Sequence, residues 1–345
     1  STPFVARWSH DGSTVGIAWS NGDATLVDGH DGRELAVLTH DSPVTDLQWA
    51  TDDSFVLTSD SSGVLRAWDP QSGRSVVELR GHTDYVSFVA VDPVGGQVAS
   101  ASDDGSARLW RLGGALPMST TTTSRPVVGL ALLPGGERAV VSQSDGTVEL
   151  LDLAGWKVER VLDRSASGVP AVSPDGALAA VVAVAPANEV RIVETSTGRV
   201  VHRITDLGTR PDPRTHETVT ARPYSVAFAP DGRRLAVASG SSLRIVDVTS
   251  GAVTASTPLV EDFGLTPLEI EKDGDLARRT VTWLPDGSAV AVTAGPGARL
   301  WDPATGLVTR WFEGHDATAQ GLAVDASGTR LVTASMDKTA RIYDV

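Results

Sequence analysis

Several absences narrow the class to which this chain can belong. It contains no cysteine, which excludes disulfide bonds and thiolate metal sites. No run of about 18 apolar residues occurs, so no transmembrane helix is expected. Lysine occurs only at positions 157, 272 and 338, and the formal net charge is −14. Nucleic acids and anionic membranes need clustered positive charge, so this balance argues against both and permits a basic partner or a cation.

The first residues also lack familiar signals. Ser1-Thr2-Pro3-Phe4 has no initiator methionine and no charged or apolar segment of a secretory signal. We therefore expect a start that is processed or cut from something longer, and we expect a cytoplasmic location. The basic residues are nearly all Arg, and Ala, Val, Gly and Asp are abundant, a composition that suggests a high-GC bacterial genome.

The chain does contain an internal repeat. An apolar residue followed by a turn such as Ser-Pro-Asp-Gly recurs eight times, at Trp8, Trp49, Val91, Leu132, Val172, Phe228, Trp283 and Val324. A second apolar residue, usually followed by an acid, lies about 19 residues later in each copy. These residues are Val27, Trp68, Trp110, Leu151, Val193, Val246, Trp301 and Tyr343. Most steps between copies are about 41 residues, and two are about 55.

Each copy contains short β-rich runs between turns. In residues 83–123, strands are expected at 85–91, 97–102 and 106–110, with a weaker fourth run. No segment keeps a helical period. Four antiparallel strands at this spacing fit a propeller blade, with the first marker residue packing between blades.

The sequence therefore predicts a single all-β domain, a β-propeller of eight four-stranded blades, with seven as the alternative. The expected blades are residues 1–40, 41–82, 83–123, 124–164, 165–220, 221–278, 279–316 and 317–345. The last copy ends at its third strand, so its outer strand is expected to be absent or to come from outside the chain. We accordingly expect one domain of a larger protein.

Gly-His and Trp-Asp dipeptides recur in the repeat. Gly81-His82, Gly314-His315, Trp68-Asp69 and Trp301-Asp302 carry them. With these dipeptides, the chain resembles the WD-repeat family over essentially its whole length. The regulatory WD-repeat domains that bacterial proteins attach to Ser/Thr kinases or NTPase switches look similar.

The resemblance implies a buried tetrad of His, Ser or Thr, Asp and Trp in some blades. In the third blade it would be His82, Ser100, Asp104 and Trp110, and in the eighth His315, Thr333, Asp337 and Tyr343. In the second blade His40, Thr58 and Trp68 fit, but Ser62 stands where Asp belongs. The fourth blade has Leu151 in place of Trp, and the first, fifth, sixth and seventh lack most of the tetrad.

Two repeats are lengthened between their fourth strand and the next first strand, at about 206–221 and 258–278. Such connections share one propeller face with the second-to-third turns, so both insertions are expected on that face. They are either a binding surface or tolerated surface decoration. The second insertion is acidic; a solvated loop is a better reading than a calcium site, because the closing Glu of a calcium loop is missing.

The same face is expected to carry the candidate binding residues. They are Trp19, Tyr85, Arg125, Arg210, Arg214, His216, Arg222, Tyr224, Glu261, Asp262, Phe263, Glu269 and Glu271. Exposed Tyr and Arg side chains at these positions would suit contact with a partner protein. An equal alternative is that they pack against neighbouring residues of the propeller rim. Trp311 and Phe312, on an outer strand, are expected to cover a sheet edge or meet another domain.

No common catalytic motif occurs, and the seven His do not cluster in sequence. We therefore predict a non-catalytic scaffold or sensor that binds a protein, peptide or other ligand, without metal or cofactor. Its expected partner is a protein or peptide, or another domain of the same polypeptide. The alternative is a propeller enzyme, lactonase or quinoprotein-like, with convergent acids or His in the central channel. Metal analysis would separate the two.

Overall fold

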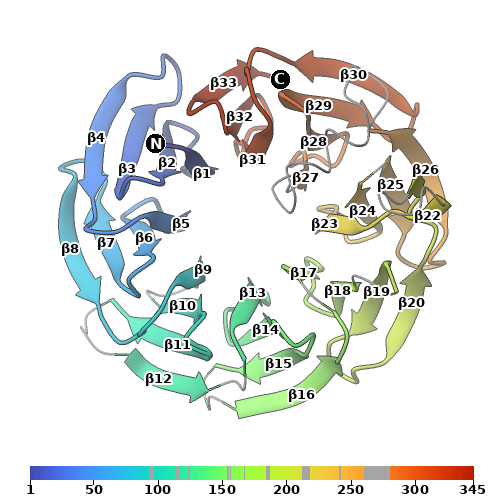
Figure 1. Cartoon of the computed structure of the whole chain (residues 1–345), viewed down its shortest axis with the longest axis horizontal. Helices are drawn as coiled ribbons and strands as arrows, with labels where there is room; N and C mark the ends of the chain where they lie inside the picture. The colour runs from blue at the N-terminus through green and yellow to red at the C-terminus, as the bar shows by residue number, and fades with distance from the viewer. Residues whose placement is uncertain are drawn as a thin grey trace.

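A computed structural model shows a ring of eight antiparallel sheets (Figure 1). It describes residues 1–92, 97–112, 117–122, 125–153, 155, 157–166, 168–183, 187–211, 218–240, 242–259 and 280–345. No helix occurs among these residues, and the eight-bladed propeller is confirmed over the seven-bladed alternative.

Each blade runs outward in chain order from the centre of the ring. The innermost strands are β1 (Pro3–Trp8), β5 (Val44–Trp49), β9 (Val86–Val91), β13 (Val127–Leu132), β17 (Ala171–Val172), β23 (Pro223–Phe228), β27 (Val281–Trp283) and β31 (Ala319–Val324). The second strands are β2 (Thr14–Trp19), β6 (Val56–Asp60), β10 (Gln97–Ser102), β14 (Arg138–Gln143), β18 (Leu178–Ala183), β24 (Arg234–Ser239), β28 (Val290–Ala294) and β32 (Arg330–Ser335). The third strands are β3 (Asp23–Asp28), β7 (Leu65–Asp69), β11 (Ser106–Arg111), β15 (Val148–Asp152), β19 (Glu189–Glu194), β25 (Ser242–Asp247), β29 (Gly297–Asp302) and β33 (Ala340–Asp344). The outer strands are β4 (Glu34–Thr39), β8 (Arg74–Leu79), β12 (Pro117–Thr122), β16 (Lys157–Asp163), β20 (Val200–Ile204), β26 (Val253–Pro258) and β30 (Leu307–Phe312).

The core lies between neighbouring blades, because both faces of each sheet are covered. Trp49, at the end of β5, packs against Ala24, Leu26 and Leu38 of the preceding blade. Its indole N–H donates to the Arg7 carbonyl of the preceding inner strand at 3.2 Å. Trp283 repeats this contact further round the ring. At Trp49 and Trp283, the residue that ends the first strand therefore fills the space between blades and also satisfies a backbone acceptor.

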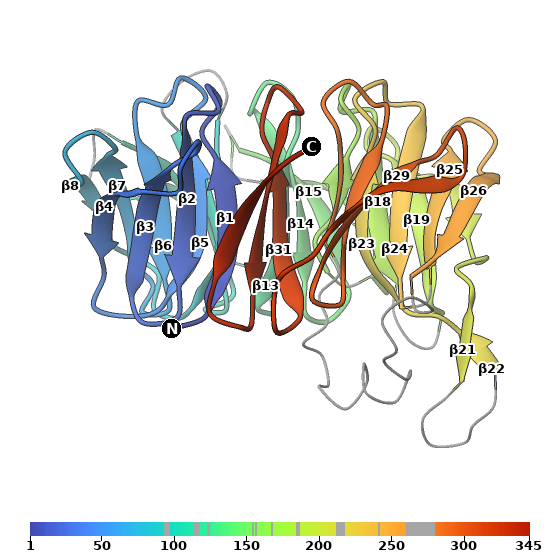
Figure 2. The ribbon, with the colours of Figure 1, turned by 90° about the horizontal axis from the view of Figure 1, so that it is seen from above.

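The second-to-third turns and the fourth-to-first connections lie on one face of the ring, here called the turn face. The His40 amide donates to the Gly22 carbonyl at 2.6 Å, and the Ser61 amide donates to the Pro43 carbonyl at 2.9 Å. This face is the lower side in Figure 2. Part of the first insertion forms a hairpin, β21 (Thr209–Pro211) with β22 (Thr218–Thr220), that projects from it.

The eighth blade has three strands, and no described strand pairs with the free edge of β33. The ring closes instead through side chains of blades 8 and 1. Trp8 and Ile17 pack with Val332 and Ala334. The Arg330 guanidinium donates to the Gly29 carbonyl at 2.6 Å, 301 residues away in sequence. This joint between blades 8 and 1 is called the seam below.

Candidate functional site

In the third blade, four buried polar side chains form one chain of hydrogen bonds. The Trp110 indole N–H donates to Ser100 Oγ at 2.8 Å, and Ser100 lies 2.7 Å from His82 Nε2. His82 Nδ1 lies 2.8 Å from Asp104 Oδ2. A neutral His82 with its proton on Nδ1 lets every donor in this chain meet an acceptor, which fixes the connection before β9 against the turn after β10.

The ionisation of this network follows from its contacts. Burial opposes the charged form of Asp104, but hydrogen bonds from Ser106 and His82 outweigh it and lower the pKa of the carboxyl. Burial lowers the pKa of His82 more than the Asp104 carboxylate raises it. A neutral imidazole beside a carboxylate is therefore the favoured state.

The eighth blade keeps the first three members of the tetrad. His315 Nε2 lies 2.7 Å from Thr333 Oγ1, and Nδ1 lies 2.8 Å from Asp337 Oδ2. Burial opposes ionisation of Asp337, but hydrogen bonds from Thr339 and His315 hold its pKa well below the usual range. The fourth member differs from an indole: the Tyr343 hydroxyl donates to the Glu313 carbonyl at 3.3 Å.

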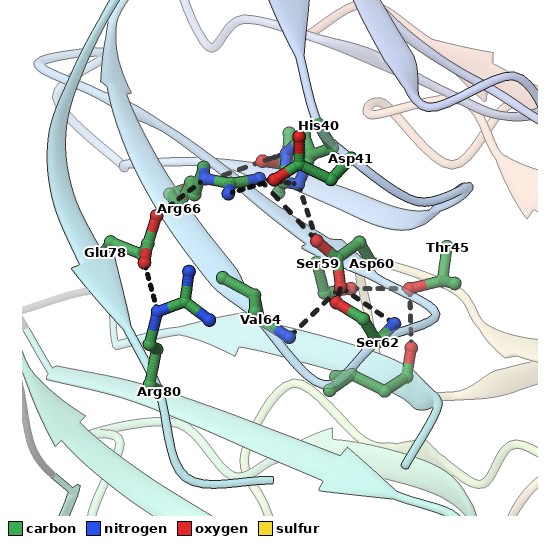
Figure 3. Close-up of polar contacts among 12 residues, drawn as sticks. His40, Asp41, Thr45, Ser59, Asp60, Ser62, Val64, Arg66, Glu78 and Arg80 are labelled. Atoms are coloured by element: carbon green, nitrogen blue, oxygen red, sulfur yellow. Dashed lines mark hydrogen bonds and ion pairs between the residues drawn. The ribbon is translucent and has the colours of Figure 1, made fainter. Parts of the chain in front are cut away.

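The second blade corrects the expectation that its tetrad lacks a carboxylate. Asp60, two residues before Ser62, supplies one, with Oδ2 at 3.0 Å from His40 Nδ1 (Figure 3). His40 Nε2 lies 2.6 Å from Thr58 Oγ1, which accepts the Trp68 indole N–H at 2.7 Å. Ser62 instead donates its hydroxyl to Asp60. The carboxylate reaches the histidine from the end of β6 rather than from within the turn.

An arginine on the third strand is a repeated feature that the sequence analysis missed. It stands two residues before the second repeat marker in six blades, as Arg66, Arg108, Arg191, Arg244, Arg299 and Arg341. Arg66 Nη1 lies 2.8 Å from His40 Nδ1, and its Nε donates to Glu78 at 3.1 Å (Figure 3). The fixed spacing from the marker could have revealed this arginine.

In the fifth blade this arginine forms a buried ion network where no tetrad exists. Arg191 Nη1 donates to both carboxylate oxygens of Asp163 at 2.7 Å, and its Nε donates to Glu189 at 2.6 Å. Arg203 donates to the same Glu189 oxygen at 2.6 Å. Because Asp163 ends β16 of the fourth blade, the network ties two blades together.

Part of the expected binding rim is exposed on the turn face. Tyr85 is 38% exposed and Tyr224 is 36% exposed. The Arg222 guanidinium lies 5.6 Å from the Tyr224 ring centroid, and Arg125 is exposed at the start of the fourth blade. Phe4, 41% exposed, was missed because it lies in the first four residues, which sequence analysis used only to judge the chain start.

The strand geometry explains the exposure of Phe4 and Tyr224. Six innermost strands carry a register shift near their start that leaves one residue unpaired. These residues are Phe4, Thr45, Ser87, Val128, Tyr224 and Gln320. A β-bulge redirects a side chain, and the unpaired residue is exposed at Phe4 and Tyr224 but buried at Thr45.

Other candidates are not gathered on this rim. Trp19 is half-buried at the seam, where its indole N–H donates to Thr25 at 2.8 Å. Arg210 pairs with Val219 in the hairpin, and its side chain is outside the described set. The following candidates lie outside the described residues: Arg214, His216, Glu261, Asp262, Phe263, Glu269 and Glu271.

The two aromatic residues of β30 have different surroundings. Trp311 is 38% exposed, with the Arg299 guanidinium 4.3 Å from its ring centroid. Phe312 is 2% exposed and its ring lies 5.4 Å from Tyr343. Phe312 therefore packs against the eighth blade of the same chain and is not available to another domain.

A groove of about 510 Å³ runs along the seam. Its lining includes Ile17, Trp19 and Val27 of blade 1 and Ala340 and Ile342 of blade 8. Among the described residues, no three His, Asp or Glu side chains are arranged to hold a metal ion. In the same portion of the chain, no helix has the length and apolar character needed to cross a bilayer.

Comparison with known proteins agrees with this geometry. Four segments, residues 32–69, 73–111, 214–247 and 306–344, match the family model described as WD domain, G-beta repeat. The computationally designed Ika8 protein superposes with a TM-score of 0.78 at 17% identity, over 100% of this chain and 96% of that protein, which shows the fold alone. The chain is thus an eight-bladed β-propeller with WD repeats in the matched segments. Blades 4 and 5, outside these segments, lack the tetrad.

Two curated relatives illustrate the similarity. Human angio-associated migratory cell protein is 24% identical over 314 residues, covering 89% of this chain and 68% of that protein. Human DDB1- and CUL4-associated factor 4-like protein 2 is 30% identical over 113 residues, covering 32% of this chain and 27% of that protein.

Proposed function

We propose that this chain is a non-catalytic binding module that holds a basic segment of a protein partner on its turn face. The observation that carries the proposal is Tyr85, an exposed aromatic residue whose backbone hydrogen-bonds two exposed acidic residues, Asp84 and Asp103. The Tyr85 amide hydrogen-bonds Asp84 at 2.8 Å, and its carbonyl accepts the Asp103 amide at 2.9 Å. Tyrosine is enriched where partners bind tightly, and adjacent acids favour Lys or Arg on the partner.

The wider setting fits this role. The net charge of −14 attracts basic partners at long range. One relative is named as a factor associated with DDB1 and CUL4, that is, with other proteins. We extend the proposal to a cytoplasmic domain of a larger signalling or assembly protein, and the Arg-rich, Lys-poor composition favours a bacterial source.

The test is a selection of binding peptides from a random library on the purified chain, followed by fluorescence anisotropy. Enriched peptides should carry Lys or Arg. Tyr85→Ala and Asp103→Asn should each weaken their binding by roughly tenfold, the scale of one interface hot spot. Val76→Ala, at a 63% exposed site on the outer strand β8, is the control and should have no effect. Equal binding by all variants would reject the turn-face site.

Metal analysis tests the non-catalytic part of the proposal. The purified chain should carry no stoichiometric transition metal or calcium, and removal of trace metal by a chelator should leave peptide binding unchanged. One bound metal per chain would favour the propeller-enzyme alternative instead.

A further inference from the structure

One position on the third strand carries opposite charges in different blades. Two residues before the second repeat marker, six blades have arginine, whereas the fourth blade has Glu149. The two kinds of residue occupy equivalent places: Arg66 lies opposite Glu78 of the outer strand, and Glu149 lies opposite Val161 in the same register. The charge is therefore reversed at one place in a framework that otherwise repeats.

The arginine sites show what this place in a blade holds. In the second blade, Arg66 Nη1 lies 3.6 Å from Asp60 Oδ2, and its Nε donates to Glu78 at 3.1 Å (Figure 3). In the fifth blade, Arg191 donates to both carboxylate oxygens of Asp163. A planar guanidinium with oxygen acceptors around it therefore fits this place in a blade that has a tetrad and in one that does not.

The fourth blade supplies acceptors at this place. Gln143 ends β14 in the backbone register that Asp60 has at the end of β6. The Gln143 amide nitrogen donates to Glu149 Oε2 at 2.9 Å. The amide oxygen, Oε1, is buried and lacks a hydrogen-bond partner in the described part of the chain, and Gln143 as a whole is 3% exposed. A buried carbonyl oxygen without a donor costs free energy, so a donor that reaches it would stabilise the blade.

The pair of Gln143 and Glu149 lies at the turn-face end of the joint between blades 3 and 4. Leu151, two residues after Glu149 on the same side of β15, packs with Ala99 of blade 3. Gln143 begins the second-to-third turn, where its backbone carbonyl accepts the Gly146 amide at 3.1 Å. Glu149 is half-buried, so part of it meets solvent at this end of the joint.

The charges of this molecule do little to stabilise an ionised Glu149. Burial raises the pKa of its carboxyl, and repulsion from the exposed Asp145 raises it further. The hydrogen bond from Gln143 and the attraction of the exposed Arg164 together lower the pKa by less, so the net shift is upward. Glu149 is therefore a carboxylate that a cation from outside the chain would stabilise.

We propose that Glu149 and Gln143 bind the guanidinium of one arginine in a partner polypeptide. The guanidinium carries five N–H donors in one plane, which suits the two carboxylate oxygens of Glu149 together with the Gln143 carbonyl. Lysine presents a point charge and matches this set of acceptors less well. The inference rests on the proposed basic partner of the turn face, and it adds an arginine contact on blade 4 to the Tyr85 contact on blade 3.

The test uses the labelled peptides that are enriched by selection on the purified chain. Each arginine of a peptide is replaced in turn by citrulline, which keeps the shape of the side chain and removes its charge. One of these replacements should weaken binding about tenfold, as measured by fluorescence anisotropy. Lysine at the same position should restore only part of the affinity, and full recovery by lysine would contradict the arginine assignment.

The matching change in the chain is Glu149→Gln. It should weaken binding of the original peptide about tenfold and should not weaken binding of the citrulline peptide further. Glu159→Gln, the same change on the exposed outer strand β16 of the same blade, is the control and should leave both affinities unchanged. The melting temperature of the Glu149→Gln variant should equal or exceed that of the parent chain, because burial disfavours the charged carboxylate more than the neutral amide.

Three results would overturn the inference and leave the proposed function standing. The first is unchanged peptide binding by the Glu149→Gln variant while Tyr85→Ala weakens it, and the second is enrichment of peptides that carry lysine and no arginine. The third is a lower melting temperature for the Glu149→Gln variant, which would assign Glu149 to an internal pair with Arg125 or Arg164. Selection that enriches neither lysine nor arginine would reject the proposed function itself.

Discussion

At the scale of single residues, one carboxylate decides how each tetrad histidine is held. Asp104 and Asp337 come from the tight turn after the second strand, whereas Asp60 comes from the end of that strand. All three reach Nδ1 of a buried histidine within 3.0 Å. The geometry of the hydrogen bond is therefore kept while the sequence position of the acid varies by two residues.

Removal of each of these acids should destabilise the ring. Asp60→Ala, Asp104→Ala and Asp337→Ala each remove the carboxylate that faces Nδ1 of a buried imidazole, which costs about 1–3 kcal/mol. Asp23→Ala should cost nothing measurable, because the Asp23 carboxylate accepts its hydrogen bond from the neighbouring Asn21 in an exposed turn and not from a buried histidine. Urea unfolding of the four variants measures these costs. Equal midpoints for all four would contradict the tetrad roles.

At the scale of strands and blades, the ion network at Arg191 replaces the tetrad as a tie between neighbours. Arg191→Met should leave Asp163 buried without its cation, while Glu189 keeps Arg203, at a cost of about 3–5 kcal/mol. Arg199→Met is the matched control, because Arg199 and Glu194 form an exposed pair and their loss should not be measurable. The check is thermal unfolding, and a smaller effect for Arg191 than for Arg199 would show that the network is not structural.

At this scale, the number of blades and the order of the strands could be predicted from the sequence, but one tetrad could not. The eight copies of two markers predicted the number of blades and the strand order, because strand runs between Gly, Asp and Pro turns are local features. The tetrad of the second blade could not be completed from sequence alone, since Asp60 reaches His40 through the bend that ends β6. The repeated arginine was visible in the spacing but not recognised.

The position of Trp19 could not be predicted either. Its distance from the second-to-third turn suggested the turn face, but the missing fourth strand of the eighth blade leaves room for the indole along the seam. The surroundings of Trp19 depend on Ala340 and Ile342 of β33, some 320 residues away in sequence.

At the scale of the whole molecule, stability should fall as the solution is acidified. Burial lowers the folded-state pKa of His82. Its contribution to the free energy of unfolding is therefore complete above its unfolded pKa of about 6.5 and is lost as the pH falls below that value. The folded-state pKa values of three carboxyls are also lowered, those of Asp60, Asp104 and Asp337. Their contributions to the free energy of unfolding are therefore lost only at lower pH, beginning near their unfolded pKa of about 3.9. Burial raises the pKa of Asp46, which acts in the opposite direction.

The expected profile is a melting temperature that declines in two stages between pH 8 and pH 3. His82→Gln should remove much of the first stage and leave the second. A melting temperature that rises from pH 7 to pH 5 would contradict the assignment of a neutral His82.

The three-stranded eighth blade has a mechanical consequence. Seven sheets have an outer fourth strand, and among the described residues the seam is held by side-chain packing and the Arg330 contacts. Under tension, the ring should break at this joint first and uncurl into a row of blades.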